Sequence, residues 1–152
     1  MKNILFVCTG NSCRSVMAEG LFRKMTETRA DQFHIASAGI SAMDGFPASP
    51  ETIEVMELEG VDVSQHLSQR LKPDMVRAAD KIFVMEKMHK EWILRLAPEA
   101  KSKVFLLGEF RTDHHAVTHD IEIPDPIRMS DSFYRNVLDV IRDCIKKVVE
   151  SS

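Results

Sequence analysis

The sequence lacks the features that mark membrane, secreted and nucleic-acid-binding proteins. Its 152 residues contain no apolar run near the roughly 20 residues that a membrane span needs. The segment from Met1 to Val7 lacks the length and the small-residue cleavage pattern of a secretory signal. Lys and Arg number 20 against 23 Asp and Glu, which gives a formal net charge of -3 rather than a basic excess. We therefore expect neither a membrane nor a nucleic acid as a partner.

Cysteine is also scarce. The three cysteines, Cys8, Cys13 and Cys144, form an odd set without the spacing of a disulfide framework. Thiols persist in reducing compartments, where they can act as nucleophiles. This pattern predicts a cytoplasmic location.

Short apolar runs alternate with segments of helical periodicity along the chain. The runs cover residues 4–7, 33–37, 82–85 and 104–107. The helical segments cover residues 15–28, a stretch from Pro50 with Ser49 as its cap, a stretch around Trp92, and a last stretch capped by Asp131. This alternation predicts one α/β domain over residues 1–152, with a four-stranded, mostly parallel sheet, helices on both faces and three layers. Ligands of such sheets bind at the carboxyl ends of the strands, so we expect the site in the turn after the first strand.

That turn holds a cysteine and an arginine separated by five residues. It reads Cys8-Thr9-Gly10-Asn11-Ser12-Cys13-Arg14-Ser15. Five residues wrapped around a tetrahedral oxyanion can point successive backbone N–H groups inward, at the N-terminus of a helix. Gly10 and Asn11 suit the left-handed backbone angles that such wrapping requires. The predicted phosphate-binding residues are therefore Thr9, Gly10, Asn11, Ser12, Cys13 and Arg14.

Three side chains of the turn have distinct predicted roles. Arg14 presents a planar fork that can hold two phosphate oxygens. Cys8 lies at the base of the resulting positive field, which favours its nucleophilic thiolate form. Ser15 can either donate a hydrogen bond to that thiolate or cap the following helix. The turn thus predicts a cysteine nucleophile with a bound phosphate above it.

These residues resemble the low-molecular-weight protein tyrosine phosphatase family. The resemblance rests on the run from Val7 to Ser15, continues through Met17-Ala18-Glu19, and extends to Ser37-Ala38-Gly39 and Asp125-Pro126. It implies a hydrolase of phosphorylated proteins or peptides, working through a phosphocysteine intermediate without a metal or another cofactor. Phosphate and other oxyanions would be its ligands. The resemblance also implies that Asn11, Ser15 and Ser37 support the loop, and that His66 hydrogen-bonds Asn11.

The reaction needs a carboxyl group that protonates the leaving group and later activates water. Asp125 is the candidate, because it precedes the stiff Pro126 just before the last helix and because the family carries its acid in an Asp-Pro pair there. Asp113, Asp120 and Glu122 are weaker candidates.

The substrate cleft departs from the family pattern. Tyrosine phosphatases commonly carry an aromatic residue directly after Asp-Pro, and here Ile127 and Arg128 follow instead. Ser12, Phe46, Ile127 and Arg128 are the predicted cleft residues, and Trp92 and Tyr134 are further aromatic candidates.

Three alternatives to a tyrosine phosphatase remain open. Thioredoxin-coupled arsenate reductases share the loop but need two further cysteines near the third strand, and no cysteine lies between Cys13 and Cys144. Protein arginine phosphatases are closer; they carry threonine four residues after the nucleophile, where this chain has Ser12. A binding module without turnover would need neither Cys8 nor Asp125.

Two further features concern redox chemistry and metals. Cys13 is a candidate partner for a reversible Cys8–Cys13 disulfide that would protect the nucleophile from overoxidation. His114, His115 and His119 lie in a polar stretch without a supporting cysteine pattern, so we expect no metal site.

Overall fold

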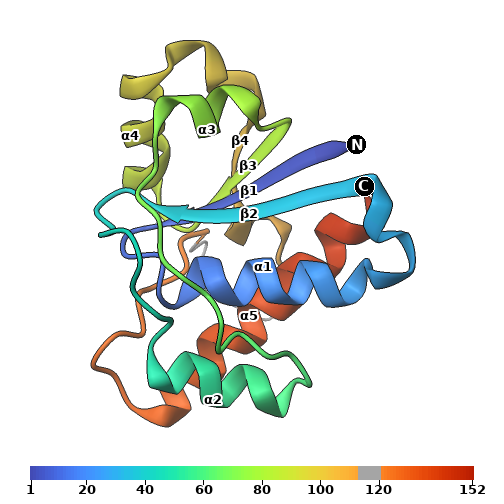
Figure 1. The fold of residues 1–152 in the computed structure, drawn as a ribbon, viewed down its shortest axis with the longest axis vertical. Coiled ribbons are helices and arrows are strands. Elements are labelled where there is room, and N and C mark those ends of the chain that lie inside the picture. The colour runs from blue at the N-terminus through green and yellow to red at the C-terminus, as the bar shows by residue number, and fades with distance from the viewer. Residues whose placement is uncertain (113–120) are drawn as a thin grey trace.

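The computed structural model describes residues 1–112 and 121–152 and forms the predicted three-layer α/β architecture. Four parallel strands lie in the order β2-β1-β3-β4. Helices α1, α2 and α5 lie on one side of the sheet and α3 and α4 on the other (Figure 1). Every pairing among these strands is parallel, whereas the sequence predicted a mostly parallel sheet.

The strands coincide with the four apolar runs. They are β1 Lys2–Cys8, β2 Phe33–Gly39, β3 Lys81–Val84 and β4 Val104–Leu106. In β1, Ile4, Phe6 and Cys8 face the core beneath α1 and α5, and Leu5 and Val7 face the core beneath α3 and α4. This alternation buries β1 on both faces, as expected for a central strand of a parallel sheet. It also directs the Cys8 side chain toward the α1 side.

The helices follow the predicted segments, with one addition. They are α1 Arg14–Met25, α2 Pro50–Leu58, α3 Pro73–Ala78, α4 Lys87–Leu96 and α5 Asp131–Glu150, with 3-10 helices at Glu27–Gln32, Pro98–Lys103 and Leu107–Phe110. Ser49 caps α2 as predicted, by accepting a hydrogen bond from the Thr52 backbone N–H. The prediction that Asp131 caps the last helix is wrong, because Ser130 accepts from the Phe133 N–H and Asp131 is the first helical residue. Helix α3 was not predicted because its six residues are too few to show a period.

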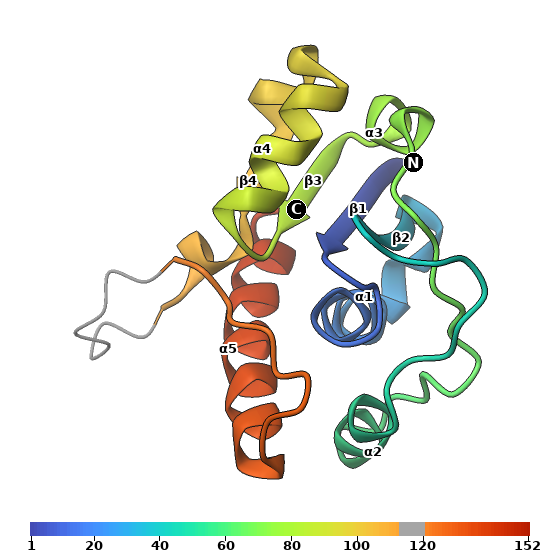
Figure 2. The ribbon, with the colours of Figure 1, turned by 90° about the vertical axis from the view of Figure 1, so that its left-hand side faces the viewer.

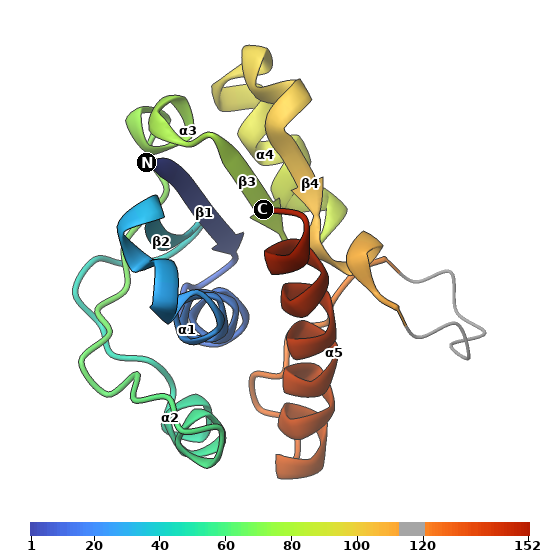
Figure 3. The same ribbon diagram turned by 90° about the vertical axis from the view of Figure 1, so that its right-hand side faces the viewer.

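Helix α1 and the long amphipathic helix α5 lie side by side under the sheet (Figure 3). The loop between β2 and α2 and the segment before α5 reach the start of α1 from opposite sides (Figure 2). The carboxyl end of β1 therefore opens between these two segments. No helix in residues 1–112 and 121–152 has the length and apolarity that crossing a membrane requires.

Candidate active site

The turn between β1 and α1 is wound so that its amides are left without protein acceptors. Asn11 adopts a left-handed backbone with a φ of 52°, as predicted. Within the described residues, the backbone N–H groups of residues 10–14 donate to no protein group. Free amide donors at the start of a helix make a site for an anion. We call residues 8–15 the phosphate loop from here on.

Gly10 and Gly39 differ in how much space the surrounding atoms leave for a side chain. Of the two residues suited to left-handed angles, only Asn11 adopts them; the φ of Gly10 is not positive, and a Cβ there would meet only Ser12 Oγ at 3.6 Å. Gly39, opposite Cys8 in the β1–β2 register, is the constrained one. A Cβ on Gly39 would lie 2.5 Å from the Thr9 carbonyl oxygen and 2.8 Å from the Asn11 nitrogen. The end of β2 must therefore be glycine for the loop to lie against it.

The Cys8 thiol sits at the end of a directed chain of hydrogen bonds. The Gln69 backbone N–H donates to Asn11 Oδ1 over 2.9 Å, which fixes the orientation of the buried Asn11 amide. Asn11 Nδ2 donates to Ser15 Oγ over 2.8 Å. Ser15 Oγ still carries its own proton, which it can donate to Cys8 Sγ at 2.9 Å. No side chain of the described residues caps α1, so of the two roles predicted for Ser15 the structure supports the hydrogen bond to Cys8.

The same asparagine ties the loop to its surroundings. Asn11 Nδ2 also donates to Ser37 Oγ over 2.9 Å, and Ser37 Oγ donates to Glu19 Oε1 over 2.5 Å. His66 Nε2 lies 2.9 Å from the Asn11 carbonyl oxygen. The expected hydrogen bond between His66 and Asn11 is thus present, although it involves the backbone of Asn11. Ser37 and His66 contact the loop from two different segments.

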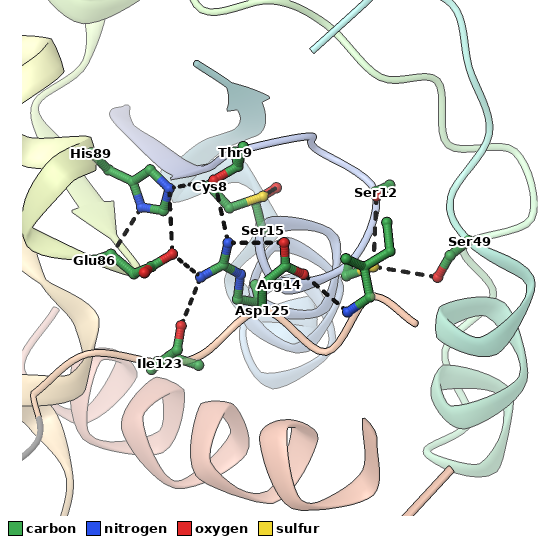
Figure 4. A network of polar contacts seen from close by, with 12 residues as sticks. Cys8, Thr9, Ser12, Arg14, Ser15, Ser49, Glu86, His89, Ile123 and Asp125 are labelled. Atoms are coloured by element: carbon green, nitrogen blue, oxygen red, sulfur yellow. Dashed lines mark hydrogen bonds and ion pairs between the residues drawn. The ribbon is translucent and has the colours of Figure 1, made fainter. Parts of the chain in front are cut away.

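Arg14 is 1% exposed and held along one edge of its guanidinium (Figure 4). Its Nη1 donates to Glu86 Oε2 over 2.6 Å and to the Ile123 carbonyl over 2.7 Å. Nη2 makes longer contacts, 3.4 Å to Thr9 Oγ1 and 3.7 Å to Asp125 Oδ2. Nε donates to no acceptor in the described chain. The Nε–Nη2 edge is therefore the weakly engaged one, and Glu86 balances the buried charge.

Asp125 lies at the mouth of the site beside Arg14 (Figure 4). Its side chain is 41% exposed, in contrast to the buried arginine. Oδ1 accepts a hydrogen bond from the Ile127 backbone N–H over 3.1 Å, which orients the carboxyl group. Of the weaker candidates, Asp113 and Asp120 lie outside the described residues.

Three of the four predicted cleft residues lie on the segments that flank the phosphate loop, and the fourth lies in the loop itself. Phe46 is 54% exposed on the loop after β2, and Ile127 is 50% exposed before α5. Arg128 is exposed with a φ of 64°, and Ser12 is half-buried in the phosphate loop. The two further aromatic candidates are placed differently: Tyr134 is fully buried with its hydroxyl near Cys13 of the phosphate loop, and Trp92 packs against the core on the other face of the sheet.

Cys13 is a free, buried thiol surrounded by hydroxyl groups. Its Sγ lies 3.4 Å from Ser49 Oγ and 3.6 Å from both Ser12 Oγ and Tyr134 Oη. Burial raises the pKa of Tyr134, so this hydroxyl stays protonated. Cys144 lies in the core, where burial raises the pKa of its thiol to about 12.

Sequence reasoning missed Glu86 and His89, which join the site from the start of α4. Glu86 binds Arg14, and His89 Nε2 lies 2.9 Å from Thr9 Oγ1. The only sequence signal was position, since both directly follow the third apolar run, at the carboxyl end of a strand next to β1. Residues 1–112 and 121–152 hold no cluster of three or more His, Cys, Asp or Glu suited to a metal ion. His114, His115 and His119 lie outside the described residues.

A buried thiol, a buried arginine and a ring of free amides at the carboxyl edge of a parallel sheet define a site for a tetrahedral oxyanion. Comparison with known proteins narrows this class. The family model for low molecular weight phosphotyrosine protein phosphatases matches residues 3–151. The chain therefore belongs to this family.

The relatives include proteins named for two different substrate classes. A probable low molecular weight protein-tyrosine-phosphatase, EpsP of Ralstonia nicotianae, is 37% identical over 93% of this chain and 90% of its own length. A protein-arginine-phosphatase of Bacillus subtilis is 30% identical over 97% of this chain and 95% of its own. The crystal structure of the tyrosine phosphatase AmsI of Erwinia amylovora superposes with a TM-score of 0.86 at 34% identity, covering 99% of this chain and 92% of that one.

Proposed function

We propose that this protein hydrolyses phosphotyrosine in proteins or peptides through a phosphocysteine intermediate. Cys8 is the nucleophile, Arg14 and the amides of residues 10–14 bind the phosphoryl group, and Asp125 is the general acid and then the general base. The observation that carries the proposal is the hydroxyl of Ser15, 2.9 Å from Cys8 Sγ at the base of a loop with free amides. A module that only binds phosphate would have no need of a hydroxyl directed at a cysteine at the base of the loop.

In the first step the Cys8 thiolate attacks phosphorus, and the bond to the tyrosine oxygen breaks. The three other phosphoryl oxygens face the loop amides and the Nε–Nη2 edge of Arg14, whose Nη1 is already held by Glu86 and Ile123. Donors fixed before the reaction stabilise the developing charge without reorganisation. Asp125 gives its proton to the leaving phenolate.

In the second step Asp125, now ionised, takes a proton from water, which attacks phosphorus and releases phosphate and the Cys8 thiolate. The contact of 3.7 Å between Asp125 Oδ2 and Arg14 Nη2 supports a carboxyl group at the phosphate. The exposure of Asp125 fits a group that meets both a leaving group and water.

Phosphotyrosine is favoured over phosphoarginine by the walls of the cleft. Phe46 and Ile127 offer exposed apolar surface, one on each flanking segment, which suits an aromatic ring. The relative named protein-tyrosine-phosphatase is also more similar than the one named protein-arginine-phosphatase.

Protein arginine phosphatase is the second candidate, and one observation favours it. Ser12 places a hydroxyl, half-buried, in the phosphate loop, where arginine phosphatases carry threonine and tyrosine phosphatases often carry an aliphatic residue. The discriminating experiment compares kcat/KM for two peptides of identical sequence that carry phosphotyrosine or phosphoarginine. A preference for phosphoarginine would reverse the assignment of substrate while leaving the mechanism intact.

The mechanism is tested by Asp125→Asn with two leaving groups. We expect kcat to fall about 10²–10⁴-fold for a phosphotyrosine peptide and much less for p-nitrophenyl phosphate, whose leaving group needs little protonation. Glu122→Gln, in the same segment, is the matched control and should retain activity. Equal losses on both substrates would remove Asp125 from the role of acid. Cys8→Ser should abolish turnover of both.

We also propose the cytoplasm as the location, because the three cysteines are free thiols. The net charge of -3 supports a protein or peptide substrate rather than a nucleic acid.

A further inference from the structure

His89 is a fully buried polar residue for which the proposed mechanism has no use. It lies in the first turn of α4, on the strand-end side of β3, and is 0% exposed. One ring nitrogen faces the phosphate loop and the other faces its own helix (Figure 4). A buried imidazole with both nitrogens engaged is fixed in orientation.

The two contacts determine where the ring carries its proton. The Glu86 backbone N–H can only donate, and it lies 3.0 Å from His89 Nδ1, so Nδ1 accepts. Burial and the nearby Arg14 charge lower the pKa of His89 to about 3, which keeps the ring neutral with one proton. That proton is on Nε2, which therefore donates to Thr9 Oγ1 over 2.9 Å. The Glu86 carboxylate, 3.9 Å from Nε2, is already bound to Arg14.

The Thr9 hydroxyl consequently becomes a donor. Its oxygen accepts from His89 Nε2 and, at 3.4 Å, from Arg14 Nη2, and these two donors occupy both of its lone pairs. The described residues offer no other partner for the hydroxyl hydrogen of Thr9. Thr9 directly follows Cys8 in the phosphate loop, so an oxyanion bound there is the acceptor within reach.

We propose that His89 is a positioning residue that turns the Thr9 hydroxyl into a hydrogen-bond donor for a phosphoryl oxygen, the oxygen that also meets Arg14 Nη2. The proposal rests on the proposed function only in that the loop binds a phosphoryl group. The Thr9 hydroxyl would act as a side-chain donor beside the loop amides. Through His89 it is connected to the start of α4, where Glu86 holds Arg14 in place.

Two substitutions of His89 separate its two hydrogen bonds. The Asn amide oxygen can replace Nδ1 as the acceptor for the Glu86 N–H, but Asn is too short to reach Thr9. The longer Gln amide can replace Nε2 as the donor to Thr9, but it gives up the contact with Glu86. We expect His89→Asn and Thr9→Val each to weaken inorganic phosphate binding and kcat/KM for p-nitrophenyl phosphate about tenfold. His89→Gln should restore most of both.

Urea unfolding of both variants shows whether activity merely follows stability. If His89 only supports the fold, the loss of phosphate affinity will follow the loss of unfolding free energy, and Gln will not rescue it. The second check is the double variant Thr9→Val/His89→Asn, which should bind phosphate no more weakly than Thr9→Val alone. Multiplying losses would overturn the proposal, because His89 would then act independently of Thr9. Met88→Ala, an exposed neighbour on α4, is the control and should leave both quantities unchanged.

Phosphate binding is measured calorimetrically, so that the result does not depend on turnover. If the parent protein binds phosphate but hydrolyses no aryl phosphate, the proposed function is refuted. The phosphate affinities of the His89 and Thr9 variants then still decide the role of His89. Parent protein that is active while His89→Asn binds phosphate normally would refute the role of His89 alone. A parent protein that binds no phosphate would refute both.

Discussion

The Asn11 side chain is the buried support on which the phosphate loop depends most, so its removal gives the sharpest test. It makes three hydrogen bonds, to Ser15, Ser37 and the Gln69 N–H. At about 1 kcal/mol for each bond, their loss lowers the free energy of unfolding by about 3 kcal/mol. Asn11→Ala loses about 1 kcal/mol more than Asn11→Gly, because the φ of 52° strains alanine.

These energies translate into thermal shifts that are easy to measure. For a chain of this size, about 3 kcal/mol corresponds to a fall in Tm of roughly 6–12 °C. Asn11→Gly should show that fall, Asn11→Ala a larger one, and the exposed Asn136→Ala on α5 almost none. Phosphate affinity should fall with both Asn11 variants. If Asn11→Gly unfolds in urea and on heating like the parent protein, the hydrogen bonds of the Asn11 side chain do not support the loop.

Three other predictions address separate features. Gly39→Ala should destabilise the protein and weaken phosphate binding, because its Cβ would approach loop atoms at 2.5 and 2.8 Å; Gly10→Ala, with open space, should destabilise it less, as denaturant unfolding will show. Cys13→Ser should recover less activity than the parent after peroxide and then reductant, because oxidised Cys8 could no longer be protected as a disulfide; equal recovery would exclude that protection. His89 remains neutral in the fold but is protonated below about pH 6.5 when unfolded, so the unfolded chain binds more protons. Stability should therefore fall as the pH drops from 6.5 toward 3, and less so in His89→Asn, in urea titrations at several pH values.

The strands and the loop could be predicted because their signals are local. Each strand is a short apolar run, and the phosphate loop combines a strand end, a nucleophile and an arginine within eight residues. Ser49 was readable for the same reason, since a cap and Pro50 are adjacent. Asp131 was chosen over Ser130 as a cap because both residue types cap helices well, and only backbone geometry separates them.

The residues that hold the site in place could not be predicted because they come from distant segments. Glu86 and His89 belong to the start of α4, and their partners Arg14 and Thr9 lie more than 70 positions earlier. An acid and a histidine in a helical first turn have no distinctive pattern, because such residues are ordinary on exposed helices. Only the parallel pairing of β1 with β3 brings the two strand ends together.

The site handles the two parts of its substrate with surfaces of different character. The proposed phosphoryl site is built on buried groups such as Asn11 and Arg14, each fixed by partners from several segments, so this part of the site has little freedom to adapt. The proposed walls for the leaving group, Phe46 and Ile127, are about half exposed and lie on connecting segments. A rigid anion site can therefore be common to relatives with different substrates, because discrimination depends on groups that contact the leaving group. This division explains why the phosphate chemistry is readable from one short motif, whereas the choice between phosphotyrosine and phosphoarginine depends on Ser12 in that motif together with Phe46 and Ile127, which are far apart in the sequence.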